Sequence, residues 1–173
     1  MKYRYCPKCG QSLQEIILGM NKAPRLKCLD CGFIFYQNSK PTASALIVNG
    51  GKVLLGKRSI EPYKNYWDIL GGFLELGESP EHGVHREIKE ETGLDIEILD
   101  LLGIFMDEYG PGGEATLNIC YLAKVVAGEA KPADDVDELR WFTASDIPKN
   151  LAFKNGRGII DLWLKKQSTT RPE

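Results

Sequence analysis

Acidic residues concentrate in one short stretch of this chain. From Gly72 to Leu94 the sequence reads GFLELGESPEHGVHREIKEETGL, and its glutamates outnumber the basic residues Arg86 and Lys89. The glutamates of the stretch are Glu75, Glu78, Glu81, Glu87, Glu90 and Glu91. So many like charges repel one another, and a bound cation would relieve that repulsion. Because carboxylate oxygens are the ligands that Mg²⁺ and Mn²⁺ prefer, the stretch predicts a divalent-metal site.

A helix must position these carboxylates. Ser79 is a favourable N-cap, Pro80 suits the first helical position, and Gly93 can adopt the left-handed conformation that ends a helix. The helix between them would run for about four turns, and residues three or four apart would share one of its faces. The carboxylates that converge on one edge are those of Glu87, Glu90 and Glu91.

Four cysteines near the N-terminus form a second pattern with chemical meaning. Cys6 and Cys9 lie in CPKCG, and Cys28 and Cys31 lie in CLDCG, with a linker of the length seen in four-cysteine zinc sites. Four thiolates satisfy a tetrahedral zinc ion and leave no open position for catalysis. A segment this short buries too little apolar surface to fold alone, so metal binding would supply its folding free energy. We expect structural zinc, with a disulfide or a redox-active CxxC as the alternative.

Composition limits the classes of protein to which the chain can belong. It has 173 residues, of which 43% are hydrophobic and 27% charged, and a formal net charge of −2. This balance is typical of a globular protein and gives no basis for a broad nucleic-acid or membrane surface. No apolar run approaches the roughly 20 residues that span a bilayer, and the N-terminus lacks the apolar core of a signal peptide. We therefore expect a cytoplasmic protein without a nucleic-acid or membrane partner.

The rest of the chain predicts strands around the acidic helix. Strands are expected at 33–36, at 42–48 and 52–56 around the turn Asn49-Gly50-Gly51, at 67–70, within 95–109 as two strands joined by a short turn, and at 116–126 and 139–143. Residues 151–166 have helical spacing. One helix among the strands and one after them imply an α/β fold, an α/β/α sandwich on a mixed sheet. We expect a zinc ribbon over residues 1–38, a main domain over 39–168 and a polar tail over 169–173.

The acidic stretch resembles the Nudix box, the signature of the Nudix hydrolases. That pattern is Gly, five residues, Glu, seven residues, and then Arg-Glu-apolar-any-Glu-Glu-any-Gly-apolar. Its fixed positions are filled here by Gly72, Glu78, Arg86, Glu87, Ile88, Glu90, Glu91, Gly93 and Leu94. The resemblance extends over about residues 42–166. It implies the Nudix fold and hydrolysis of a phosphoanhydride bond with Mg²⁺ or Mn²⁺.

The same resemblance implies roles for individual residues. Glu87 and Glu91 would bind the metal directly, with Glu90 as a third ligand. Arg86 would act with Glu87 and Glu91 in catalysis and would pair with Glu78, tying the preceding loop to the helix.

The general base is expected to be an acidic residue. Glu87 is the candidate within the box, and Glu108 and Glu114 are candidates in the loop that follows. By the resemblance, Asp135 occupies a position that often supplies a further metal ligand.

The expected substrate follows from the ribbon and from the segment after the box. A CxxCG ribbon directly before such a domain is similar to the NADH pyrophosphatase branch of the family. Residues 103–114 do not carry that branch's Ser-Gln-Pro-Trp-Pro-Phe-Pro-like sequence. We therefore expect a nucleoside diphosphate linked to another group, with ADP-ribose first and NADH or a related dinucleotide second. A non-catalytic nucleotide-sensing or RNA-binding module is the alternative class, and a homodimer would match many relatives.

Overall fold

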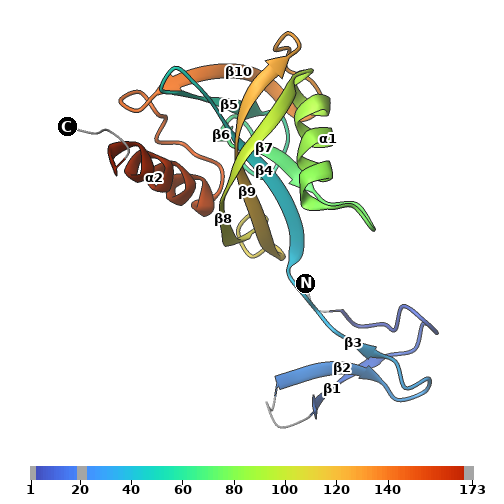
Figure 1. Cartoon of the computed structure of the whole chain (residues 1–173). Helices are drawn as coiled ribbons and strands as arrows, with labels where there is room; N and C mark the ends of the chain where they lie inside the picture. The colour runs from blue at the N-terminus through green and yellow to red at the C-terminus, as the bar shows by residue number, and fades with distance from the viewer. Residues whose placement is uncertain (1–2, 19–22, 170–173) are drawn as a thin grey trace. The chain divides into compact units, whose positions relative to one another are not determined.

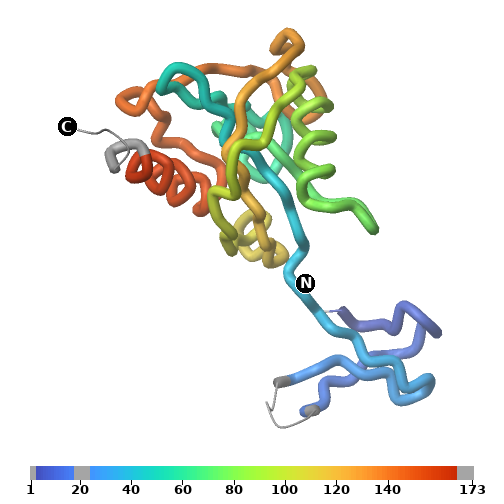
Figure 2. Tube along the Cα trace, viewed as in Figure 1, coloured from blue at the N-terminus to red at the C-terminus, as the bar shows by residue number. Residues whose placement is uncertain are grey.

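The structure is a computed structural model that describes residues 3–18 and 23–169. The chain divides into two compact units, Met1–Ser39 and Lys40–Glu173, and Figure 2 traces the path through each. The expected polar tail falls partly on Thr169, which ends the last helix, and its residues 170–173 lie outside the described part. Among the described residues, no helix is long and apolar enough to cross a membrane.

The first unit is a three-stranded antiparallel sheet with the two CxxCG turns beside it. Its strands are β1 (Leu13–Leu18), β2 (Ala23–Cys28) and β3 (Ile34–Phe35), in the order β1-β2-β3. Only the last of these was predicted from the sequence. In the turns, Gly10 N donates to Cys6 O at 2.9 Å and Gly32 N donates to Cys28 O at 3.0 Å. Both glycines have positive φ, 77° and 74°, which favours glycine after each cysteine pair.

The second unit is built on a mixed seven-stranded sheet. Its strands are β4 (Lys40–Asn49), β5 (Lys52–Arg58), β6 (Trp67–Asp68), β7 (Leu70–Phe73), β8 (Asp95–Glu108), β9 (Ala115–Ala127) and β10 (Val136–Thr143). The order is β10-β5-β4-β9-β8, with β6 beside β5 and β7 beside β4. Because β4 and β9 run parallel and the other pairs are antiparallel, the predicted mixed sheet is confirmed.

Two helices cover opposite faces of this sheet, as Figure 1 shows. Helix α1 (Pro80–Thr92) buries Val84 and Ile88 in one hydrophobic core cluster. Helix α2 (Lys154–Thr169) buries Ile160 and Trp163 in the other. The α/β/α sandwich expected from the sequence is therefore confirmed.

The segment 95–109 differs from the prediction. It is the single strand β8, not two strands joined by a turn. Its register against β9 shifts at three places, between Asp95 and Ile96, Ile98 and Asp100, and Leu101 and Gly103. Such bulges absorb extra residues without ending a strand, and they break the alternation of polar and apolar residues that a sequence reading relies on.

Strand β4 changes its partner along its length, and this change shapes the site. Residues 47–49 pair with β5, whereas Thr42 to Ala45 pair with β7. Through the second pairing, β7 places Gly71 opposite Ser44 and Gly72 opposite Ala43. The two glycines thus lie where the carboxylates of α1 can approach the backbone.

Candidate active site

Helix α1 begins and ends as its sequence predicts. Ser79 Oγ accepts a hydrogen bond from His82 N at 3.2 Å, and Pro80 is the first helical residue. At the other end, Gly93 has a φ of 71° and its N–H donates to Lys89 O. These caps fix the register of the helix and therefore the direction of each glutamate on it.

Hydrogen bonds from Arg86 connect this helix to the segment before it. Its Nε and Nη2 donate to Glu78 Oε1 and Oε2, each at 2.9 Å, and Nη2 also donates to Phe73 O at 3.1 Å. Its Nη1 donates to Glu87 at 2.9 Å and to Glu90 at 3.0 Å. The predicted pair of Arg86 with Glu78 is thereby confirmed, and it has the bidentate fork geometry that fixes the guanidinium group. The fixed guanidinium group in turn orients the Glu87 carboxylate through Nη1.

The structure brings together two of the three carboxylates predicted to converge. Glu91 is 5% exposed, and its Oε2 accepts from Gly71 N at 2.9 Å. Glu87 lies against Gly72, whose missing Cβ would stand 2.5 Å from the Glu87 carboxylate carbon. Both glutamates line a cavity of about 230 Å³. Glu90 does not line it, and its side chain is 49% exposed beside Arg86.

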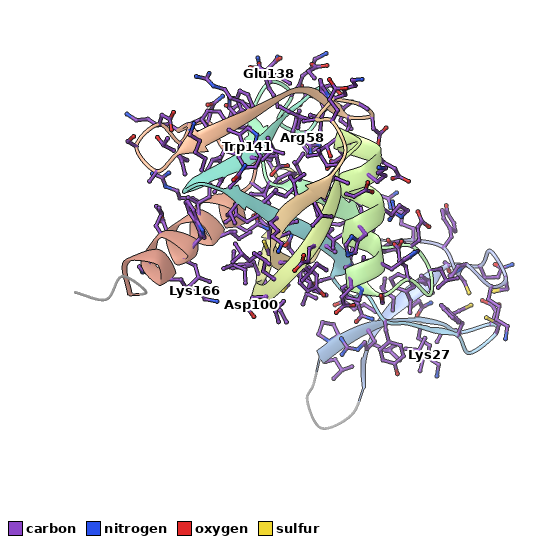
Figure 3. The ribbon with its side chains drawn as sticks, turned by 45° about the horizontal axis from the view of Figure 1, so that its top comes forward. Lys27, Arg58, Asp100, Glu138, Trp141 and Lys166 are labelled. Atoms are coloured by element: carbon purple, nitrogen blue, oxygen red, sulfur yellow. The ribbon has the colours of Figure 1, made fainter. Side chains whose placement is uncertain are left out.

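Acidic residues from outside the box complete this end of the cavity. Asp68 of β6 and Asp135, just before β10, line it together with Arg58 of β5. Arg58, labelled in Figure 3, donates from Nη1 to Asp68 Oδ2 at 3.2 Å and lies 3.9 Å from Asp135 Oδ2. The sequence analysis missed Asp68 and Arg58. Each is a charged residue at the end of a strand, and that signal alone does not show that the two strands meet.

The charges at this end of the cavity are not balanced by the protein. Burial raises the pKa of Glu91 well above its ordinary value, and the nearby carboxylates of Asp135, Glu87 and Asp68 raise it further. Burial also raises the pKa of Glu87, against the effect of Arg86, and raises that of Asp68 to about 7, against the effect of Arg58. A hard divalent cation would favour the ionised form of each group, so this donor set fits Mg²⁺ or Mn²⁺.

Two of the candidate bases, Glu108 at the end of β8 and Glu114 in the loop after it, do not line the cavity. Glu108 is exposed and does not line it, and Glu114 forms an ion pair with Lys40. The neighbouring Asp107 does line it, and its Oδ2 accepts from Asn155 N at 2.7 Å. Of the three candidate bases named from the sequence, only Glu87 faces the cavity.

The four cysteines of the first unit form a separate cluster that could hold a metal ion. Their Sγ atoms all lie within 4.8 Å of one another, with Cys6 3.6 Å from Cys31 and Cys9 3.5 Å from Cys28. None of the four is in a disulfide. Four thiolates about 2.3 Å from a tetrahedral zinc ion would stand about 3.8 Å apart, so the spacing fits zinc.

Loss of one thiolate should unfold the first unit alone. We expect Cys28→Ser to abolish zinc binding and to remove amide-exchange protection from residues 3–18 and 23–39, because bound zinc would supply their folding free energy. Residues 40–169 should keep their protection. Zinc content by mass spectrometry and hydrogen exchange check both statements. Cys120→Ala, which changes a cysteine of the second unit, is the matched control, and equal zinc content in the Cys28 variant would contradict the assignment.

The ion pair of Glu78 should make stability depend on pH in the acidic range. Its hydrogen bonds from Arg86 and from Glu75 N lower the pKa of Glu78 from 4.5 to about 2. A lowered pKa contributes stability that is present above about pH 4.5 and is lost as the pH falls toward 2. We therefore expect wild type to melt above Glu78→Gln at pH 7 and the difference to vanish near pH 2. A difference that is independent of pH in thermal scans would refute this account.

Comparisons with known proteins agree with this geometry. The family profile described as NUDIX domain matches residues 38–163, and the zinc-ribbon profile described as Nudix N-terminal matches residues 4–37. A crystal structure of a NUDIX hydrolase from Nitrosomonas europaea is 27% identical, with a TM-score of 0.82, over 98% of this chain and 95% of that one.

Two curated relatives differ in how much of the chain they share. The "ADP-ribose pyrophosphatase" of Methanocaldococcus jannaschii is 37% identical over 73% of this chain and 74% of its own length. The "NAD-capped RNA hydrolase NudC" of Pseudomonas aeruginosa is 30% identical over 95% of this chain. The chain spans 57% of the length of that second relative.

Proposed function

Because this chain belongs to the Nudix hydrolase family, we propose that it hydrolyses the diphosphate linkage of a nucleoside diphosphate joined to another group. The observation that carries the proposal is the cavity in which Glu87 and Glu91 meet Asp68 and Asp135 beside the backbone of Gly71. Its excess of negative charge matches divalent cations, which a diphosphate also binds. ADP-ribose is the first candidate substrate.

Glu87 and Glu91 would hold the metal, with Glu90 as the third proposed ligand. When bound there, Mg²⁺ or Mn²⁺ would neutralise phosphate oxygens and lower the pKa of a bound water. The Gly71 N–H and Arg86 keep the Glu91 and Glu87 carboxylates in place. Arg86 thus acts by positioning Glu87.

Hydrolysis requires a water oxygen to attack phosphorus while the bridging P–O bond breaks. The water loses a proton, and the products are a nucleoside monophosphate and a second phosphomonoester. Glu87 is the proposed acceptor of that proton, because among the candidate bases named from the sequence it is the one that lines the cavity.

The relatives support two substrates. The archaeal relative is named for ADP-ribose, and the bacterial relative that aligns along both units is named for an NAD cap. NADH or another dinucleotide is therefore the second candidate. Structural zinc in the first unit is part of the same proposal.

A substrate panel tests the proposal. We expect full-length protein with Mg²⁺ or Mn²⁺ to convert ADP-ribose to AMP and ribose 5-phosphate, or NADH to AMP and reduced nicotinamide mononucleotide. Ion-exchange chromatography separates these products, and a nucleoside triphosphate serves as the comparison. Tight nucleotide binding without turnover of any compound would instead favour the non-catalytic sensing module.

A further inference from the structure

The charges of this protein are divided unevenly between its two units. Residues 1–39 contain six lysines and arginines but only two acidic residues, Glu15 and Asp30, whereas residues 40–173 have an excess of acidic residues. Zinc bound by four thiolates would remove only part of the positive charge of the first unit. The composition of the whole chain, from which no nucleic-acid partner was expected, therefore conceals a basic first unit.

Basic side chains of this unit gather on one face of its three-stranded sheet. Residues directly opposite each other in neighbouring strands share a face, and alternate residues of each strand return to it. Arg25 lies opposite Ile16. Lys27, labelled in Figure 3, lies opposite Gln14 and Ile34. We call the side of the sheet that carries these five residues the basic face, and none of the five is acidic.

The basic face is the open side of the sheet, because packing occupies the other side. On that other side Cys28 is completely buried, and the ring of Phe35 contacts that of Tyr3, with centroids 4.4 Å apart. The described part of the first unit contains no helix that could cover the sheet. Both cations of the basic face, Arg25 and Lys27, are partly exposed. A ligand could therefore reach them.

An exposed aromatic ring extends the basic face. Tyr36 directly follows β3 and is 59% exposed. The guanidinium group of Arg25 lies over this ring, 5.6 Å from its centroid. Among the residues that the structure describes, neither Arg25 nor Lys27 forms an ion pair with a carboxylate. The surface thus places two cations without an anionic partner beside a ring that is open to a ligand.

Single-stranded nucleic acid supplies groups for both features of this surface. Its phosphodiester groups bind lysine and arginine, and its unpaired bases stack on aromatic rings and guanidinium planes. A duplex exposes phosphates but keeps the faces of its bases stacked on one another. An acidic peptide would pair with the cations and would gain little from the ring. Charge complementarity together with the ring therefore favours a single strand.

We propose that the basic face and Tyr36 bind single-stranded nucleic acid, with Arg25 and Lys27 at phosphate groups and Tyr36 stacked on a base. The inference goes beyond the proposed function and does not depend on it, because it concerns the first unit alone. RNA and DNA share this chemistry, so the experiment compares the two.

Fluorescence anisotropy of the full-length, zinc-loaded protein tests this surface. The probe is a single strand of about ten nucleotides, made as RNA and as DNA, with a 5′-hydroxyl group and a 3′ label. It contains no diphosphate, so its binding does not require the cavity of the second unit. We expect the affinity to fall as salt is added, because bound phosphates release counterions. A duplex of the same sequence should bind more weakly.

Substitutions separate the contribution of charge from that of stacking. Lys27→Gln should weaken binding and reduce the salt slope by about 0.7, the value for one phosphate contact with a single strand. Tyr36→Leu should weaken binding roughly fivefold or more and leave the salt slope unchanged. Lys131→Gln makes the same charge change at a side chain of the second unit that is 72% exposed, and it is the matched control. All three variants should keep their zinc and hydrolyse diphosphates like wild type.

The inference is overturned if wild type binds neither strand, or if it binds the duplex as tightly as the single strands. Binding that Lys27→Gln and Tyr36→Leu leave unchanged, or that Lys131→Gln weakens equally, has the same consequence. If Lys27→Gln loses its zinc, Arg25→Gln carries the charge test. Tighter binding of RNA than of DNA would identify RNA as the natural strand, and the reverse result would identify DNA.

The proposed function can fail separately from this inference. Strand binding by a protein that hydrolyses no diphosphate would retain the inference and reject the function. Turnover of small diphosphates without strand binding would retain only the function.

Discussion

Glu91→Gln is expected to lose nearly all turnover while remaining folded. The substitution keeps the shape of the side chain and an oxygen for Gly71 N, but it removes the charge of the most buried carboxylate in the cavity. Loss of an outer residue that supports a metal ligand typically costs about 10–100-fold in activity or metal affinity, so loss of a ligand itself should cost more. The measurements are kcat/KM for ADP-ribose and the affinity for Mn²⁺.

The same variant should be more stable than wild type when no metal is present. Burial raises the pKa of Glu91 above its ordinary value of 4.5, so its ionised form disfavours the folded state as the pH rises above that value. Gln carries no such charge. We expect Glu91→Gln to melt at a higher temperature at pH 7, with the difference disappearing below about pH 4.5. Added Mg²⁺ should raise the melting temperature of wild type only.

Glu129→Gln is the matched control. It is the same substitution, glutamate to glutamine, at a side chain that is 80% exposed. It should retain wild-type turnover. Equal turnover by Glu91→Gln and wild type would remove Glu91 from the metal site. Glu90→Gln belongs in the same series, and a loss as large as that of Glu91→Gln would place Glu90 among the ligands.

Gly72→Ala should impair catalysis with little effect on folding. A Cβ at Gly72 would stand 2.5–2.6 Å from the carboxylate atoms of Glu87, and that flexible end can move away. Gly72 is not among the residues with positive φ, so alanine fits its backbone. We expect turnover to fall about 10–100-fold, as when a metal ligand loses its orientation, with an unchanged melting temperature.

Gly71→Ala should instead reduce the stability of the fold. Gly71 has a φ of 139°, and its Cβ would overlap the backbone of Ala43 and Ser44, which cannot move aside without disturbing β4. Backbone strain of this kind costs at least about 1–3 kcal/mol. Thermal unfolding should show the loss directly. If the two variants lost stability to the same extent, the distinction between displacing a side chain and displacing a strand would be wrong.

Several local structures of this protein could be predicted because they depend on residues that are close in sequence. The caps of α1, its pairing of Arg86 with Glu78 and the two CxxCG turns depend on neighbours within about eight residues, and their residue types specify them. The order of strands and helices was likewise sufficient for the fold class. The interruption expected in 95–109 was wrong, because bulges hide a continuous strand from a reading based on alternation.

The membership of the site depended on contacts that span much longer distances in the chain. Glu90 shares an edge of α1 with Glu87 and Glu91, yet Arg86 holds it on the exposed flank. Asp68 and Asp135 join the cavity because β6 and the start of β10 pair with the same strand, β5.

The sequence by itself therefore identified the family, through its resemblance to the Nudix box, and the bounds of the helix that carries the box, because capping is a local property. Tertiary structure decided which carboxylates face the cavity and which strands line it. Thr42 and Asn118 lie far apart in the chain and become neighbours only when β4 and β9 pair in parallel. Such pairing depends on the whole sheet, so the partner of either strand cannot be predicted from the sequence of that strand alone.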